Sequence, residues 1–160
     1  PSMSQEAKAG VKLSALTHIG IVVRDVDKTA EFYCSTFGLG PFKVYELRIE
    51  NVLFRGRPTA CRVKVATAQV GGVQIELIEV LEGETPHTEF LRSRGEGVQH
   101  IAFDVTELDS KIGELAKLGV EPFFSRASFA YLDTDKTGGV IFELQRTPHP
   151  PIEVSYIIGK

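Results

Sequence analysis

Several features that would place a protein in a specialised class are scarce or missing in this sequence. It has two cysteines in 160 residues and no CxxC spacing, which speaks against a disulfide framework and suggests a reducing compartment. The net charge of −3 gives no reason to expect a nucleic-acid partner. No apolar run approaches the ~20 residues that a membrane span needs, and residues 1–11 lack the apolar core of a secretion signal. We therefore expect a cytoplasmic protein with no nucleic-acid or membrane partner.

An internal repeat is the most informative feature that is present. The segment GGVQIEL at 71–77 returns as GGVIFEL at 138–144, and THIGIVV at 17–23 returns as QHIAFDV at 99–105. Each half supplies one His and one Glu inside an apolar run. Repeats of this kind indicate that one structural unit occurs twice.

Hydrophobic periodicity and turn residues predict the same order of elements in both halves. In the first half we expect a strand at 16–23, a helix from Asp25 through Thr36, and strands at 42–49, 61–70 and 73–80. In the second half we expect a strand at 98–105, a helix from Thr106 to Leu118, and strands at 120–125, 129–133 and 139–145. A short helix is expected at 86–93. Residues 49–60, rich in Arg, Gly and Pro, are expected to form a loop.

These elements predict an α+β protein with a single domain at 14–147. The domain contains one module at 14–81, a linker at 82–96 and a second module at 97–147. Residues 1–13 are expected to be a flexible N-terminus and residues 148–160 a C-terminal tail. The apolar part of the tail, 152–158, is expected to pack on the domain or to reach a partner subunit.

Four polar residues stand where a strand would face the interior. Because alternate residues of a strand share a face, His18 lies beside the small Gly20, and His100 lies beside Ala102. Glu76 and Glu143 occupy matched positions in the last strand of each module; Gln74 shares the face of Glu76 and ranks below it as a candidate. A single His or Glu on a strand is more often an ordinary core or surface residue. Four at matched positions favour a divalent cation, because buried carboxylates are costly unless paired. Two nitrogen and two oxygen donors suit Zn²⁺, Ni²⁺, Co²⁺, Fe²⁺ or Mn²⁺.

With these motifs the chain resembles the vicinal oxygen chelate superfamily, in which paired βαβββ modules form a curved mixed sheet around a metal. The segments THIGIVVRD at 17–25, GEGVQHIAF at 95–103 and GVIFEL at 139–144 carry the resemblance. The resemblance implies that one divalent ion is held by four ligands: His18, Glu76, His100 and Glu143.

Within this superfamily the GEGV lead-in is similar to that of methylmalonyl-CoA epimerases. That likeness implies proton abstraction alpha to a coenzyme A thioester, with Glu143 as the first candidate base and Glu76 serving the opposite face. The middle-strand position where such epimerases often carry an acid is Val65 here. Bacterial glyoxalase I enzymes carry an Arg and an Asn for glutathione where this chain has Val22 and Val80.

Alternative functions remain open from the sequence. They are a glyoxalase I-type lactoylglutathione lyase, a ring-cleaving dioxygenase and a metal-free protein that sequesters an antibiotic. Arg55 and Arg57, with Arg62 and Lys64 nearby, are candidates for contacting the phosphates of an acyl-thioester substrate. His87 and His149 are assigned no role. We also expect a homodimer, since many relatives dimerise.

Overall fold

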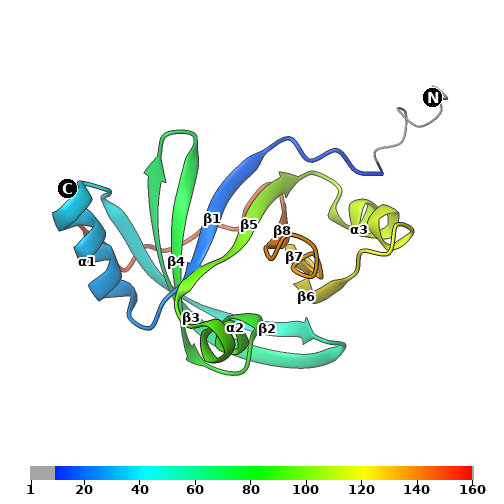
Figure 1. The fold of residues 1–160 in the computed structure, drawn as a ribbon, viewed down its shortest axis with the longest axis horizontal. Coiled ribbons are helices and arrows are strands. Elements are labelled where there is room, and N and C mark those ends of the chain that lie inside the picture. The colour runs from blue at the N-terminus through cyan, green and yellow to red at the C-terminus, as the bar shows by residue number, and fades with distance from the viewer. Residues whose placement is uncertain (1–9, 160) are drawn as a thin grey trace.

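The computed structural model describes residues 10–159, which form nine strands and three helices (Figure 1). Residues 1–9 of the expected N-terminal segment lie outside the described residues. The elements of the first half are β1 (Leu16–Val22), α1 (Val26–Phe37), β2 (Phe42–Phe54), β3 (Arg57–Val70) and β4 (Val73–Glu82). Those that follow are α2 (Pro86–Arg94), β5 (Gly97–Val105), α3 (Leu108–Ala116), β6 (Pro122–Arg126), β7 (Phe129–Leu132), β8 (Ile141–Arg146) and β9 (Tyr156–Ile158).

All nine strands belong to one mixed sheet with the order β3-β4-β1-β5-β8-β7-β6-β2-β9. The first strands of the two modules, β1 and β5, run antiparallel to each other at the centre. Each is flanked on its other side by the last strand of its own module, paired in parallel. Because β2 also pairs with both β3 and β6, the sheet curls round and closes on itself. The α+β architecture of two βαβββ modules is confirmed.

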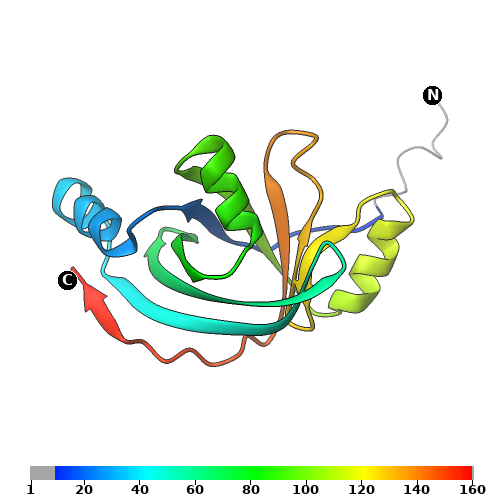
Figure 2. The ribbon, with the colours of Figure 1, turned by 90° about the horizontal axis from the view of Figure 1, so that it is seen from below.

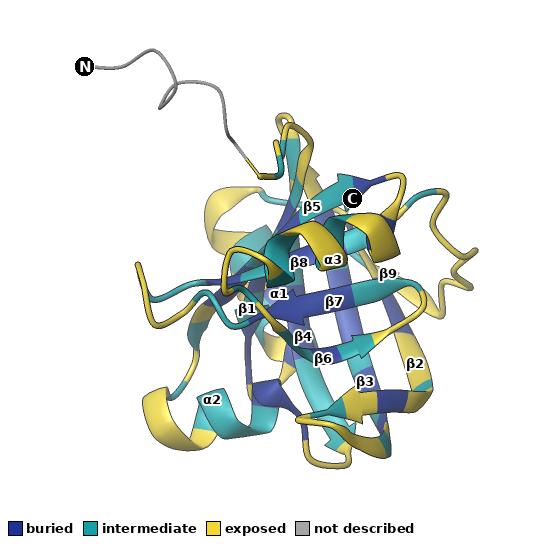
Figure 3. Ribbon diagram, turned by 90° about the vertical axis from the view of Figure 1, so that its right-hand side faces the viewer, coloured by how far each residue is buried: buried dark blue, intermediate teal, exposed yellow. Residues whose placement is uncertain are grey.

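The helices cover different parts of the curled sheet (Figures 1 and 2). The outer face of the first module packs against α1 through Val26 and Ala30, and that of the second packs against α3 through Leu108. Phe90 and Leu91 of α2 pack against the cluster of apolar residues inside the curl, which includes Val65 and Phe124. Most of β7, which contributes to that interior, is buried (Figure 3). The interior is therefore closed on one side by the helix that joins the modules.

Local signals explain where the helices begin and end. The Asp25 side chain accepts a hydrogen bond from the Lys28 N–H at the start of α1, and Gly38 ends that helix in the left-handed conformation at φ +68°. Thr85 caps α2 through a reciprocal pair of hydrogen bonds with Thr88. The expected cap at Thr106 is wrong by one residue. The cap of α3 is Glu107, whose side chain makes no capping hydrogen bond.

The loop expected at residues 49–60 is wrong. Strands β2 and β3 continue through this segment as a hairpin whose two turn residues are Arg55 and Gly56, with φ of +50° and +80°. Positive φ at both positions gives the tight turn whose twist matches that of the flanking strands. The Arg, Gly and Pro residues therefore mark one turn and a strand start. The hairpin extends far enough for Leu53 and Phe54 to pair with β6.

The C-terminal segment packs on its own domain. It runs along the molecule to β9, which pairs antiparallel with β2 from Phe42 to Val44 (Figure 2). Cys34 and Cys61 are both free thiols. Within residues 10–159, none of the helices has the length and apolarity required to span a membrane.

Candidate metal centre

Four neighbouring strands bring the predicted ligands together at the centre of the sheet. In the order β4-β1-β5-β8, these strands carry Glu76, His18, His100 and Glu143 respectively. His18, His100 and Glu143 are at most 5% exposed, and the Glu76 side chain is 14% exposed. Two predicted ligands therefore come from each module and meet across the β1–β5 seam.

The donor atoms lie within contact distance of one another. The Nε2 atoms of His18 and His100 are 3.2 Å apart. Glu76 Oε2 lies 3.4 Å from His18 Nε2, and Glu76 Oε1 lies 3.4 Å from His100 Nε2. Glu143 Oε1 lies 3.3 Å and 3.4 Å from the same two nitrogens. Donors that bind one ion at about 2.0–2.2 Å lie roughly 2.9–3.6 Å apart at neighbouring positions. His18, His100 and Glu143, whose donor atoms lie within 4.8 Å of one another, therefore fit a divalent metal ion, and Glu76 contacts both histidines.

Small residues make room for the imidazoles. Gly20 pairs with Glu76 on one side and His100 on the other, and Ala102 pairs in the same way with His18 and Glu143. A Cβ placed on Gly20 would lie only 2.0 Å from Cε1 of the His100 ring. Glycine at this position is therefore required by the ring that faces it.

The electrostatics of the centre favour a bound cation. Burial by itself lowers the pKa of His18, but the Glu76 and Glu143 carboxylates outweigh it and raise that pKa to about 9. For Glu76, burial acts to raise the pKa, and the two imidazoles override it and lower the pKa to about 2. In the metal-free protein a proton on His18 thus compensates the carboxylates, and an ion would take its place.

Two glutamines contact the predicted ligands from outside the donor set. Gln99 Oε1 lies 3.0 Å from His100 Nδ1. When Nδ1 carries the hydrogen of the ring, it donates to this oxygen, and the unprotonated Nε2 faces the centre. Gln145 Nε2 donates to Glu143 Oε2 at 3.4 Å. Glu143 therefore presents Oε1 to the imidazoles and keeps its second oxygen outside that contact, whereas both oxygens of Glu76 face imidazoles.

A cavity of about 310 Å³ lies beside the centre and is lined by His18, Glu76 and Glu143. Gln74 also lines it, but Glu76 is the residue that contacts both imidazoles. Val65 lines the cavity too, so the middle strand presents an apolar side chain there.

The basic residues proposed for substrate binding are dispersed. Arg55 lines a separate pocket beside α2, where it pairs with Glu89 at 2.6 Å, and Arg57 lies exposed at the start of β3. Arg62 pairs with Glu46 and Glu82, and Lys64 pairs with Asp27 at 2.6 Å. The cavity beside the centre is lined by three other arginines, which sequence reasoning did not single out: Arg48, Arg126 and Arg146.

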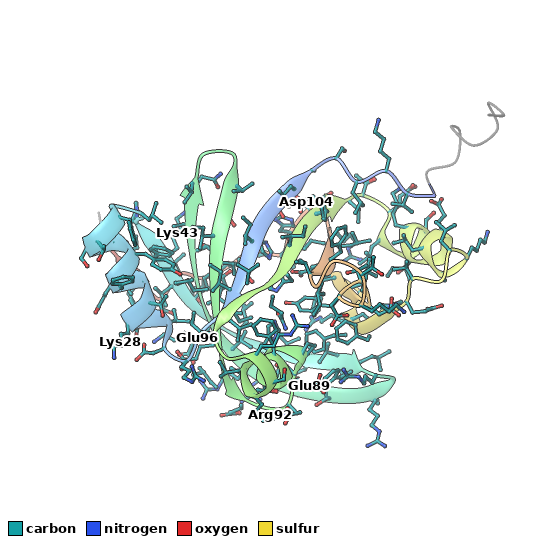
Figure 4. The ribbon with its side chains drawn as sticks, viewed as in Figure 1. Lys28, Lys43, Glu89, Arg92, Glu96 and Asp104 are labelled. Carbon is teal, nitrogen blue, oxygen red and sulfur yellow. The ribbon has the colours of Figure 1, made fainter. Side chains whose placement is uncertain are left out.

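Two histidines to which the sequence assigned no role lie at this cavity. His87 is 2% exposed, and its ring centre is 6.0 Å from that of His100. His149 pairs with Asp104 at 2.7 Å, and the tail residues that follow it line the cavity. Asp104 lies at the opposite end of β5 from Glu96 (Figure 4). No sequence signal marked His87, since it belongs to the linker and has no counterpart in the other module.

The family of the chain follows from comparison with known proteins. The family model described as Glyoxalase/Bleomycin resistance protein/Dioxygenase superfamily matches residues 17–135. The chain belongs to this superfamily. The resemblance that the sequence motifs indicated is thereby confirmed, and the matched residues include both histidines and Glu76 of the candidate centre.

Individual proteins resemble the chain over most of its length. Uncharacterized protein YqjC of Bacillus subtilis is 30% identical over 82% of this chain and 91% of its own. The mitochondrial methylmalonyl-CoA epimerase of Mus musculus is 24% identical over 91% of this chain and 80% of its own. The structure of methylmalonyl-CoA epimerase from Mycobacterium tuberculosis is 25% identical, with a TM-score of 0.64 over 92% of this chain and 96% of its own. A 4-hydroxyphenylpyruvate dioxygenase of Legionella pneumophila is 30% identical, but the match spans only 33% of that protein.

Proposed function

We propose that this protein is a metal-dependent enzyme that removes a proton alpha to the carbonyl of an acyl-coenzyme A thioester, as a methylmalonyl-CoA epimerase does. The observation that carries the proposal is the pair of His18 and His100 nitrogens, 3.2 Å apart, each with an oxygen of Glu76 and of Glu143 within 3.3–3.4 Å, beside a cavity. His18, Glu76, His100 and Glu143 would hold the ion. When bound, a divalent cation supplies electrostatic stabilisation of the negative charge that forms on a carbonyl oxygen.

The two carboxylates differ in a way that supports a separate role for each. Glu143 lines the cavity and keeps Oε2 outside its contacts with the imidazoles, so it is suited to accept the alpha proton. Glu76 contacts the imidazoles through both oxygens and is the acidic group available from the other module. Glu143 is therefore the first candidate for the base, and Glu76 is the candidate for the opposite face of the substrate.

The cavity favours a substrate with phosphate groups. Arg48, Arg126 and Arg146 line it, and guanidinium groups match phosphate oxygens in charge and geometry. Arg146 is exposed, and no ion pair within residues 10–159 involves it or Arg126. The likeness to methylmalonyl-CoA epimerases supports the same class of substrate. Glutathione is disfavoured, because Val22 is buried in the apolar interior.

Hydrogen exchange in D₂O tests the proposal directly. The metal-loaded protein is incubated with methylmalonyl-CoA and, separately, with the hemithioacetal of glutathione and methylglyoxal. We expect deuterium at the alpha carbon of methylmalonyl-CoA and none in the hemithioacetal. Exchange only in the hemithioacetal would instead establish the glyoxalase alternative, and tight ligand binding without any metal would establish the sequestration alternative.

A dioxygenase is the second candidate, because His18, His100 and Glu143 form a group of two histidines and one carboxylate within 4.8 Å. That set is typical of non-haem Fe²⁺ oxygenases. Glu76 reaches both histidines as well, which leaves fewer positions for oxygen and a substrate. Oxygen uptake by the Fe²⁺-loaded protein with 4-hydroxyphenylpyruvate is the measurement that separates the two functions, and we expect none.

A further inference from the structure

A chain of hydrogen bonds lies in the cavity wall and has no part in the proposed metal centre. His87 Nε2 lies 2.8 Å from the Tyr131 hydroxyl, and His87 Nδ1 lies 3.1 Å from Thr85 Oγ1. Both His87 and Tyr131 line the cavity and are at most 4% exposed. The Tyr131 ring centre lies 5.0 Å from that of His100, and Tyr131 pairs with Glu143 across β7 and β8.

The direction of each hydrogen in this chain follows from counting donors. A hydroxyl oxygen has two lone pairs and one hydrogen. Thr85 Oγ1 already accepts hydrogen bonds from the backbone N–H groups of His87 and Thr88, at 3.1 Å and 3.3 Å. Its own hydrogen is therefore the one that joins it to His87 Nδ1, so Nδ1 is an acceptor.

The histidine then carries its hydrogen on the other nitrogen. Because Nδ1 accepts the hydrogen of Thr85 Oγ1, the ring is the neutral form, which has one N–H. With Nδ1 accepting, that N–H is at Nε2 and donates to the Tyr131 oxygen. The Tyr131 hydrogen is consequently left to donate elsewhere, and within residues 10–159 the Tyr131 hydroxyl makes no hydrogen bond besides the one with His87.

We propose that the Tyr131 hydroxyl, oriented by His87 and Thr85, donates a hydrogen bond to the substrate oxygen that becomes negatively charged when the alpha proton leaves. The proton goes to Glu143, the electron pair of the broken C–H bond forms a carbon–carbon double bond, the π pair of the carbonyl moves onto its oxygen, and Tyr131 stays protonated. A buried donor whose direction is already fixed stabilises such a charge without reorganisation. Tyr131 is thereby a catalytic residue, and His87 and Thr85 are positioning residues. The assignment rests on the proposed function.

The test compares Tyr131→Phe with Tyr33→Phe in Co²⁺-loaded protein. Tyr33 lies on α1 against Phe42, outside the cavity. Its substitution also removes one tyrosine hydroxyl and is therefore the matched control for Tyr131→Phe. For Tyr131→Phe we expect kcat for exchange of methylmalonyl-CoA to fall about 10- to 100-fold, with KM changed less than about threefold. Affinity for acetohydroxamate, an anion with two adjacent oxygens, should fall about 10-fold. Both values should be unchanged in Tyr33→Phe.

Variants of His87 test the positioning role. His87→Leu removes the donor to Tyr131 and should lower kcat, whereas His87→Gln keeps an N–H donor and should restore most of it. In the metal-free protein, ¹⁵N NMR should show the His87 hydrogen on Nε2. A hydrogen on Nδ1, or a Tyr131→Phe variant with the kcat and acetohydroxamate affinity of the unsubstituted protein, would overturn the inference.

Failure of the proposed function gives a different result. If the unsubstituted protein exchanges no proton of methylmalonyl-CoA, while Tyr131→Phe still weakens acetohydroxamate binding, the donor is placed as inferred and the epimerase-like function is wrong. If exchange is normal in both proteins, the function stands and the role of Tyr131 is wrong.

Discussion

Gly20→Ala tests the geometry of the metal centre most directly. The new Cβ would lie 2.0 Å from Cε1 of His100, whereas ordinary contact begins at 3.4 Å, so the ring must retreat by about 1.4 Å. The length of a metal–nitrogen bond varies by only about 0.2 Å around its usual value. His100 would therefore cease to be a ligand. Loss of a residue that only supports a ligand lowers metal affinity by up to about 100-fold, so we expect the affinity for Zn²⁺ or Co²⁺ to fall by at least that factor.

Isothermal titration of the metal-free protein, with a competing chelator, measures this affinity. The matched control is Gly72→Ala, since a Cβ at Gly72 meets no atom within 4 Å. Thermal unfolding separates the two effects of Gly20→Ala, because overpacking costs typically about 1–3 kcal/mol and leaves a folded protein. A folded Gly20→Ala variant with unchanged metal affinity would refute the assignment of His100 as a ligand.

Further predictions concern the residues around the centre and the cavity. Glu143→Gln should lower proton exchange of methylmalonyl-CoA about 10²- to 10⁴-fold, and Glu76→Gln should lower epimerisation with a smaller effect on exchange of one enantiomer. Because the pKa of His18 in the metal-free protein is about 9 and the ion binds the neutral ring, metal affinity should rise with pH up to about 9. The raised pKa of His18 also contributes to the stability of the metal-free fold. This contribution should be fully present below about pH 6.5 and should be lost as the pH rises through about 9. Gln99→Leu should weaken metal binding about 10- to 100-fold, because His100 loses the acceptor for Nδ1. Arg126→Ala should raise KM for the coenzyme A thioester and leave kcat nearly unchanged.

Four of these predictions have a specific contrary outcome. Full exchange activity in Glu143→Gln would exclude that residue as the base. A metal affinity independent of pH between 6 and 9 would mean that His18 is not protonated in the metal-free protein. Normal metal affinity in Gln99→Leu would show that His100 binds the metal without the hydrogen bond between its Nδ1 and Gln99. An equal rise in KM for methylmalonyl-CoA and for a short thioester without phosphates would mean that Arg126 does not contact the phosphates.

Repeated segments made most of the fold predictable from the sequence. Because strands alternate their faces, the spacing of His18, Glu76, His100 and Glu143 within the repeats is enough to predict that they share one side of the sheet. The hairpin at residues 49–60 was not predicted, since Arg55 with positive φ is an unusual turn residue and the repeat gave no second copy for comparison.

Contacts between distant segments account for the rest. Tyr131 contacts His87, which lies in the linker, 44 positions away along the chain. No local pattern links a linker histidine to a strand tyrosine. Likewise, the arginines that line the cavity become neighbours only when the sheet curls. Proximity along the chain instead favoured a different group of basic residues as the predicted phosphate contacts.

The seam between β1 and β5 has a consequence for stability. One imidazole and one carboxylate reach the centre from each repeat, so neither repeat alone has more than half of the donors. An ion bound at this site would connect the two repeats. Its binding free energy would add to the free energy required to separate them. Loss of the ion would loosen the junction of the two repeats before it affected the outer helices.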